Sequence, residues 1–256
     1  MPEARYIDGS GGSVDTTDRG LNYGDGLFET VAIRANTLRN FPLHLERLEL
    51  GAERLRLPLP ALAELTDRAQ AAAAGIENGT LKLVVTRGNG PRGYAPPDVA
   101  TPTIILSAAP VSGPAPATLA VATLKMRLAE NEALAGIKHL CRLEQVLGRL
   151  ELKTLDADEG LMLSTSGAVI GGTSRNVFAV FGRRLTTPDV ELAGIAGVMR
   201  RCVIEAAGRI GIDVTVCDLS LSEFAEADEL FMTNALVGIQ SVATLDGRAY
   251  GQRNVA

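Results

Sequence analysis

One proline- and glycine-rich segment constrains the fold of this chain more than any other feature. Residues 110–117 have the sequence PVSGPAPA, which breaks both helices and strands. On either side, runs of apolar residues with strand and helix spacing are long enough to build separate cores. We therefore predict two domains, a smaller N-terminal α/β domain over residues 1–113 and a larger C-terminal domain over residues 114–256.

Apolar spacing and turn residues predict mixed secondary structure in both halves. Asn40 is a candidate helix cap, with Pro42 in the first turn of the helix that follows. A second helix should end before Gly75. The N-terminal half is expected to hold helices over 41–55 and 60–74 and strands over 29–35, 80–86 and 103–107. The C-terminal half is expected to hold helices over 142–155 and 198–210 and strands over 119–124, 159–163, 177–181, 214–217 and 229–232.

The composition excludes several classes of function. The net charge is -5 and the sequence has no basic run, which argues against a nucleic-acid or anionic-membrane partner. The longest apolar stretches have the length of a strand, so no membrane-spanning helix is expected. Cys141, Cys202 and Cys217 are not closely paired, and the N-terminus has no signal-peptide pattern. We expect a cytoplasmic protein.

Lys138 is a candidate catalytic residue because of its setting. It follows Ala135-Gly136-Ile137 and precedes His139-Leu140, so its ammonium group belongs to a mostly apolar run. Such a lysine either extends its charge to solvent or sits where its pKa falls. The neutral amine is the form that Schiff-base chemistry requires. An ordinary solvated lysine remains the alternative at this point.

Two glycine-rich segments are candidate binding loops. Residues 193–200, AGIAGVMR, place a glycine turn before a helix, where free backbone N–H groups can bind a phosphate. A tight turn that only starts a helix is the alternative. Residues 87–94, RGNGPRGY, lack the ending of a P-loop, and their two arginines better suit a carboxylate-bearing substrate. The sequence shows no cysteine and histidine cluster with zinc spacing and no serine-hydrolase elbow.

Three further blocks follow one another along the chain in a fixed order. They are DRGLNYGDGLFET at 18–30, HLERL at 44–48 and GIKHLCRLEQV at 136–146. Together they resemble the fold-type IV pyridoxal-phosphate enzymes, which include branched-chain and D-amino-acid aminotransferases and the aminodeoxychorismate lyases. The block around Lys138 and the run Arg92-Gly93-Tyr94 are most similar to the lyases. The resemblance extends from about Asp8 to Val242.

This resemblance implies a two-lobed α+β or α/β fold with pyridoxal 5'-phosphate bound between the lobes. It implies a lyase that converts 4-amino-4-deoxychorismate to 4-aminobenzoate and pyruvate, a step of folate biosynthesis, and a homodimer without a metal. Lys138 would bind the cofactor covalently and act as the catalytic base. The other implied site residues are Arg47, Val198, Met199 and Asn234 for the cofactor phosphate, and Arg92 and Tyr94 for the substrate.

Two residues depart from the family pattern. A glutamate that bonds to the pyridine nitrogen usually follows the strand ending at Ile170, but this chain has Gly171 there. Cys141 replaces an asparagine that is common in the lyases. A transaminase depends more on a protonated ring than does an elimination that ends in an aromatic product. Gly171 therefore favours the lyase, or it marks reduced activity.

Two other functions remain open on the sequence alone. One is a D-amino-acid or branched-chain aminotransferase of the same fold. The other is a paralogue that has kept the fold and the dimer but has lost catalysis, against which the intact Lys138 and Arg47 argue.

Overall fold

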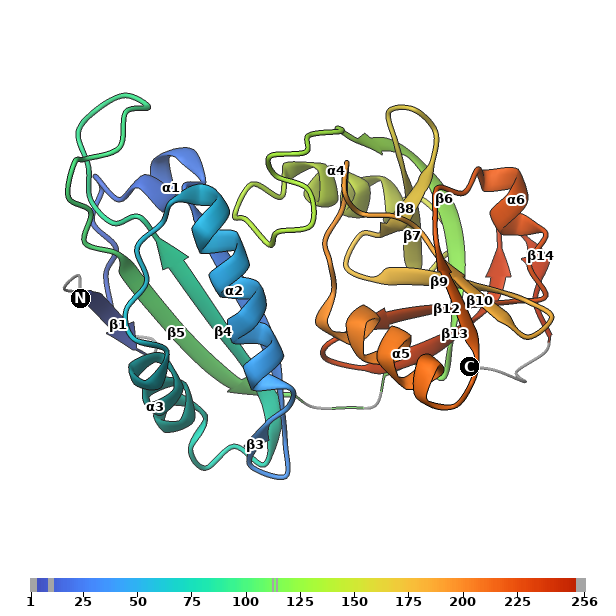
Figure 1. Ribbon diagram of the computed structural model, residues 1–256, viewed down its shortest axis with the longest axis horizontal. Helices are drawn as coiled ribbons and strands as arrows, with labels where there is room; N and C mark the ends of the chain where they lie inside the picture. The colour runs from blue at the N-terminus through green and yellow to red at the C-terminus, as the bar shows by residue number, and fades with distance from the viewer. Residues whose placement is uncertain (1–3, 9–11, 112, 114, 252–256) are drawn as a thin grey trace. The chain divides into compact units, whose positions relative to one another are not determined.

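The computed structural model describes residues 4–8, 12–111, 113 and 115–251, and it divides the chain into two compact units (Figure 1). The first unit contains the chain up to Gly113 and a short segment, Ile137–Cys141. The second contains the rest. Two residues of the predicted linker, Ser112 and Pro114, lie outside the described residues.

The first unit is built on a five-stranded sheet with the strand order β1-β5-β4-β2-β3. Only the β1–β5 pair is parallel. Along β4, every second side chain is buried, with Leu81, Leu83 and Val85 at 0% exposure, which is the alternation expected of a strand that packs one face on a core. The strands are β1 (Arg5–Asp8), β2 (Gly26–Arg34), β3 (Thr37–Leu38), β4 (Asn78–Thr86) and β5 (Thr103–Pro110).

Three helices accompany this sheet: α1 (Arg19–Tyr23), α2 (Phe41–Leu55) and α3 (Leu62–Ala73). α2 packs against β2, and α3 packs against β5 and β4. Asn40 is the N-cap residue of α2 and Pro42 stands in its first turn, both as predicted. Asn40 adopts a left-handed conformation with φ 53°, and its side chain makes no capping hydrogen bond.

The segment Ile137–Cys141 extends the first sheet although it lies far along the chain. Its backbone pairs with the start of β2: the N–H of Phe28 donates to the carbonyl of Lys138 at 3.0 Å, and the N–H of Leu140 donates to the carbonyl of Gly26 at 3.0 Å. The sequence assigned Lys138 to the C-terminal domain. The structure groups it with the first unit instead, because these long-range strand contacts cannot be seen in local sequence.

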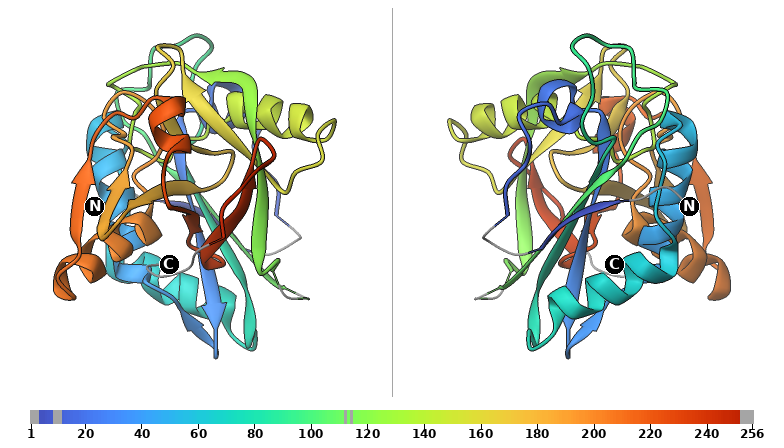
Figure 2. Two further views of the ribbon diagram at one scale, coloured as in Figure 1. Left: turned by 90° about the vertical axis from the view of Figure 1, so that its right-hand side faces the viewer. Right: turned by 90° about the vertical axis from the view of Figure 1, so that its left-hand side faces the viewer.

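The second unit holds a nine-stranded, strongly curled sheet with the order β11-β10-β9-β12-β13-β6-β7-β8, where β14 pairs with β13 (Figure 2). Its strands are β6 (Thr118–Leu128), β7 (Glu159–Ser164), β8 (Val169–Gly172), β9 (Asn176–Phe181), β10 (Arg184–Thr187), β11 (Asp213–Val216), β12 (Glu229–Asn234), β13 (Gly238–Leu245) and β14 (Arg248–Ala249). Its helices are α4 (Leu143–Leu152), α5 (Val198–Arg209) and α6 (Leu221–Ala225). The sequence did not predict β10, β13, β14 or α6.

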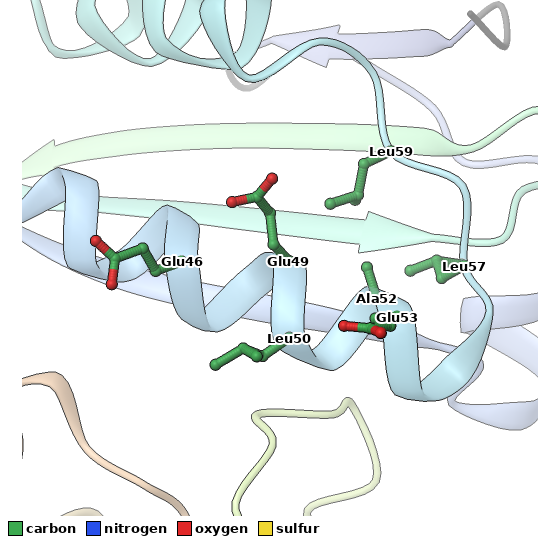
Figure 3. A pocket seen from close by; sticks show the side chains of 7 residues that line it. All are labelled: Glu46, Glu49, Leu50, Ala52, Glu53, Leu57 and Leu59. Atoms are coloured by element: carbon green, nitrogen blue, oxygen red, sulfur yellow. The ribbon is translucent and has the colours of Figure 1, made fainter.

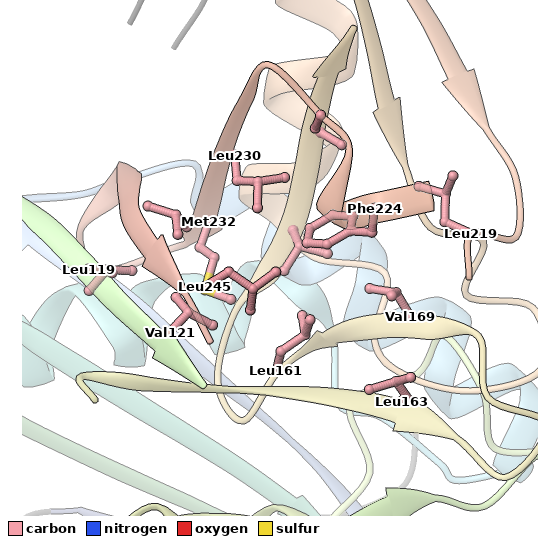
Figure 4. Close-up of a cluster of buried hydrophobic side chains, with 14 residues drawn as sticks. Leu119, Val121, Leu161, Leu163, Val169, Leu219, Phe224, Leu230, Met232 and Leu245 are labelled. Carbon is pink, nitrogen blue, oxygen red and sulfur yellow. The ribbon is translucent and has the colours of Figure 1, made fainter. Parts of the chain in front are cut away.

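Side chains of β9 pack on both faces of the second sheet. Val177 and Ala179 belong to a large apolar cluster that also contains Leu161, Phe224 and Met232 (Figure 4). Phe178 and Val180 point to the other face, where the ring of Phe178 stacks on Phe231 at 4.8 Å between centroids and α5 covers them. A strand buried on both faces has a continuous apolar run, which explains the sequence NVFAVF.

The longest helix of the described residues is α2, and none of their helices is long and apolar enough to cross a membrane.

Candidate active site

Lys138 lies at the edge of the first sheet, beside β2. Its Nζ atom is 4.3 Å from the centroid of the Phe28 ring, in a cation–π contact, and the residue is half-buried. The backbone of Lys138 is fixed by its hydrogen bond with Phe28. The backbone that carries the amine is therefore held at the edge of the sheet.

The next residue of β2, Glu29, holds Arg47. Glu29 is 1% exposed, and its carboxylate accepts hydrogen bonds from Arg47 Nε at 2.8 Å, from Arg47 Nη2, and from His44 Nδ1 at 2.6 Å. Both donors come from α2. His44 is itself 1% exposed. Arg47, the predicted phosphate ligand, is thereby fixed in direction, and β2 carries the anchors of both Arg47 and Lys138.

The pKa of Glu29 lies below its ordinary value. Burial alone would raise it, but the hydrogen bonds from His44 and Arg47 and the charge of Arg47 outweigh that effect. An ionised carboxylate can only accept, so His44 carries its hydrogen on Nδ1. Glu29 and His44 therefore form a fixed support behind Arg47.

In the second unit, a glycine turn before α5 offers free backbone donors. Gly197 is the N-cap residue of α5, and no side chain caps this helix end. A Cβ atom at Gly197 would lie 1.9 Å from Asn176 Oδ1, so only glycine allows this approach. The Nδ2 of Asn176 donates to the carbonyl of Ile195 at 2.9 Å and ties the turn to β9. The N–H groups of Val198 and Met199 are thus positioned at the positive end of a helix dipole.

A buried hydroxyl group lies on the strand next to this turn. Thr233 of β12 is 0% exposed, and among the described residues its Oγ1 has no hydrogen-bond partner. Thr233 pairs directly with Asn176 across β12 and β9, so the two side chains share one face of the sheet. Buried hydroxyls are normally satisfied, and a bound oxyanion beside α5 would satisfy this one.

Asn234, a predicted phosphate residue, also shapes the turn that follows β12. Its Oδ1 accepts hydrogen bonds from the N–H groups of Leu236 and Val237, each at 3.0 Å. The side-chain oxygen is thus committed to the turn between β12 and β13. Any contact of this segment with a phosphate would depend on the turn that Asn234 shapes.

The predicted substrate residues Arg92 and Tyr94 lie on an exposed loop of the first unit, between β4 and β5. Tyr94 is 85% exposed, and its ring contacts that of Tyr23 edge-on, with centroids 5.6 Å apart. The loop has no regular secondary structure beyond a bridge between Asn89 and Asp18. Both side chains are therefore presented to solvent rather than packed on the core.

Gly171 is crowded by backbone. A Cβ atom at this position would lie 2.8 Å from the carbonyl oxygen of Arg175, so the glutamate that is usual in the family does not fit without a backbone shift. Glu159, on the neighbouring strand β7, is the buried carboxylate beside this turn. Thr173 Oγ1, Ser174 Oγ at 3.1 Å and Arg175 Nε at 3.1 Å all donate to it.

An open hollow of about 530 Å³ lies along α2 and the segment after it (Figure 3). Three glutamates, Glu46, Glu49 and Glu53, line it together with apolar side chains, and the lining contains no basic residue. Its negative charge would repel a phosphate or a carboxylate-bearing substrate. This hollow is therefore not the binding site for either of these anions.

Among the described residues, no group of three or more histidine, cysteine or acidic side chains could hold a metal ion.

A family model, Amino-transferase class IV, matches residues 26–245. The chain belongs to the class IV aminotransferase family. An aminodeoxychorismate lyase from Vibrio harveyi is 34% identical over 236 residues, which cover 90% of this chain and 86% of that protein. A putative branched-chain-amino-acid aminotransferase from Methanocaldococcus jannaschii is 30% identical, over 98% of this chain and 89% of that protein.

Among solved structures, a 4-amino-4-deoxychorismate lyase from Pseudomonas aeruginosa matches this class IV chain with a TM-score of 0.90 and 43% identity. The match covers 95% of this chain and 92% of that one. The predicted family and the two-domain α+β fold are confirmed. The family is pyridoxal-phosphate-dependent, which agrees with the predicted cofactor.

The sequence missed three residues that shape the site of this class IV protein. Glu29 fixes Arg47, while Asn176 and Thr233 lie beside the glycine turn. Glu29 stood inside the motif quoted for the resemblance, and an acidic residue in an apolar strand was a usable signal. Asn176 and Thr233 gave none, because only strand pairing brings them together.

The Glu29 network predicts a pH-dependent stability. Because its pKa is depressed on folding, Glu29 contributes stability that is fully present above about 4.5 and is lost as the pH falls through the lower folded value. Glu29→Gln should lower the free energy of unfolding of the first unit by about 3 kcal/mol at pH 7. In strong acid, the variant and the unmodified protein should have the same free energy of unfolding. Urea titrations at several pH values test this, with the exposed Glu49→Gln as control; a gap that does not depend on pH would contradict it.

The crowding at Gly171 predicts opposite effects for two glycine substitutions. Gly171→Ala should destabilise the second unit by about 1–3 kcal/mol, since the new Cβ meets a carbonyl oxygen. Gly208→Ala, inside α5 with nothing within 4 Å, should stabilise it by about 0.5–1 kcal/mol. Chemical denaturation measures both. Equal effects of the two substitutions on the free energy of unfolding would show that the carbonyl oxygen of Arg175 does not exclude a side chain at position 171.

Proposed function

We propose that this protein is a pyridoxal-phosphate-dependent carbon–oxygen lyase that converts 4-amino-4-deoxychorismate to 4-aminobenzoate and pyruvate, a step of folate biosynthesis. The observation that carries the proposal is the likeness to the Pseudomonas aeruginosa lyase, at 43% identity over more than nine-tenths of both chains. The Vibrio harveyi relative, also a lyase by name, supports the same activity.

The residues of this chain suit the cofactor. An anionic phosphate fits the uncapped start of α5, where Val198 and Met199 offer N–H groups, and the unpartnered hydroxyl of Thr233. Arg47 would add a guanidinium whose direction Glu29 already fixes. The two units would correspond to the predicted N-terminal and C-terminal domains.

Bound pyridoxal phosphate supplies an electron sink for the bonds of an attached amine. In the proposed reaction, Lys138 would hold the cofactor, and its amine would accept the proton from the carbon that bears the substrate amino group. The same amine would return a proton to the methylene carbon of the enolpyruvyl group as the carbon–oxygen bond breaks. Pyruvate leaves, and the remaining ring becomes aromatic.

Arg92 and Tyr94 are the proposed substrate contacts. The substrate carries carboxylates, and a guanidinium binds a carboxylate through two parallel hydrogen bonds. Both side chains lie on the exposed loop before β5.

A branched-chain or D-amino-acid aminotransferase is the second candidate, since relatives with those names cover 92–98% of this chain. Gly171 disfavours it. Transamination depends on a protonated pyridine ring, which a partner carboxylate stabilises, and this position cannot hold one without a backbone shift. An elimination that yields an aromatic ring has a driving force of its own.

The three cysteines are free, so we propose a reducing, cytoplasmic location.

We further propose a homodimer in which α4 contributes to the interface. The helix exposes Leu143 by 76%, Val146 by 51%, Leu147 by 50% and Leu150 by 52%. Positions i, i+3, i+4 and i+7 lie on one face, so these side chains form a continuous apolar stripe. A twofold axis pairs the same surface of two copies, and such a stripe is self-complementary.

Lys138→Ala should abolish both cofactor-linked visible absorbance and the release of pyruvate and 4-aminobenzoate from aminodeoxychorismate. Lys153→Ala, at the exposed end of α4, should leave both intact. Borohydride reduction and peptide mapping should place the cofactor tag on the peptide that contains Lys138. A tag on Lys153 or Lys82 would overturn the assignment, and amino-donor activity without pyruvate release from aminodeoxychorismate would favour the aminotransferase.

The double variant Leu147→Glu/Leu150→Glu should shift the protein toward a monomer in light scattering, because four charges would face one another across the twofold axis. Ile210→Glu, at an exposed apolar position at the end of α5, is the control and should remain dimeric. An unmodified protein that is a fully active monomer would refute the proposed dimer.

A further inference from the structure

The exposed loop that carries Arg92 and Tyr94 is bound through its backbone by one buried arginine. Arg19, the second residue of the motif at 18–30, is 3% exposed. Its Nη1 donates to the carbonyls of Gly93 and Ala95, each at 3.1 Å, and its Nη2 donates to that of Tyr94 at 2.8 Å. Three consecutive carbonyls of the loop thus converge on a single guanidinium group.

The remaining bond of Arg19 fixes the guanidinium itself. Its Nε donates to Asp25 Oδ2 at 2.8 Å, so four hydrogen bonds start from this one side chain. Asp25 also receives a two-point contact from Arg87, from Nε at 2.8 Å and from Nη2 at 3.0 Å. Two cations therefore share one carboxylate, and carbonyl dipoles balance the excess positive charge. For Arg19 those dipoles belong to the loop, and for Arg87 they are the carbonyls of Leu55 and Arg56 at the end of α2.

Tyr23 adds a second attachment of the same loop. Its hydroxyl accepts a hydrogen bond from the N–H of Gly93 at 3.0 Å, and its ring contacts the ring of Tyr94. The guanidinium carbon of Arg19 lies 4.9 Å from the centroid of the Tyr23 ring. Arg19 and Tyr23 come from the two ends of α1, so this short helix forms a platform under the loop.

We propose that Arg19 is a positioning residue for substrate binding: through its bonds to the carbonyls of residues 93–95, it presets the loop that carries Arg92 and Tyr94. This inference rests on the proposed role of those two side chains in substrate binding. Ordering the loop before the substrate arrives reduces the entropy cost of binding, so Arg19 acts on substrate affinity without touching the substrate.

Lysine cannot replace Arg19 in this role. A guanidinium has five N–H donors in a planar fork, and four hydrogen bonds here start from it. An ammonium group keeps the charge but has only three donors on one atom. Arg19→Lys therefore separates the geometric role of the side chain from its charge.

The test measures loop order and kinetics in the holoenzyme of four proteins: the unmodified chain, Arg19→Lys, Tyr23→Phe and the control Arg39→Lys. Arg39 is an exposed arginine of the same unit. In Arg19→Lys, amide hydrogen exchange over residues 90–96 should rise at least about tenfold, while exchange in β4 stays unchanged. The KM for aminodeoxychorismate should rise about tenfold with kcat within about threefold. Cofactor absorbance should not change.

Tyr23→Phe removes one loop hydrogen bond and keeps the aromatic ring. It should therefore raise the loop exchange rate and the KM, but by less than Arg19→Lys does. If Arg19→Lys fails to fold, the result for Tyr23→Phe tests the inference in its place. Unchanged exchange in the loop, or faster exchange with an unchanged KM, would overturn the inference. If the unmodified protein releases no pyruvate, the proposed lyase function fails by itself. The same KM and kcat comparison with an amino-acid donor then tests the loop.

Discussion

The carboxylate of Asp25 connects three parts of the first unit. Arg19 binds it from α1 and Arg87 binds it from the end of β4, and each arginine uses its other N–H groups on backbone carbonyls. Burial alone would raise the pKa of Asp25, but the hydrogen bonds from Arg87 and Arg19 outweigh it and keep the pKa below its ordinary value. One ionised carboxylate therefore joins α1, the end of α2 and the exposed loop.

A buried carboxylate that binds an arginine and other donors occurs at two further places. Glu29 fixes Arg47 together with His44, and Glu159 binds Arg175 and the hydroxyls of Thr173 and Ser174. Buried ion pairs add little net stability, because desolvation offsets their attraction, but removing one partner is costly. In this protein they fix the directions of the Arg47 guanidinium, of the backbone at residues 93–95, and of the turn that follows Gly171.

How far the sequence predicted the fold depended on how local the signal was. The long helices and the apolar strands were found within a few residues of their observed bounds, because helical and alternating spacing are local patterns. β13 was missed, since Ile239 and Gln240 begin a strand whose identity depends on its partners β12 and β6. Asn40 occupies the predicted cap position of α2, but its backbone is left-handed and its side chain makes no capping hydrogen bond.

The sequence alone determined the chemistry available to the protein: Lys138 in its apolar run, Arg47 in its motif, the glycine turn before Val198, and a glycine where a glutamate is usual. The tertiary structure decided which of these groups are supported and by what. Three pairings join parts of the chain that local spacing cannot relate. Residues 137–141 pair with β2, Thr233 pairs with Asn176, and Arg19 binds the loop 74 to 76 residues away. Side-chain type is written in the sequence, whereas the burial and partners that fix its direction arise only when distant segments pack together.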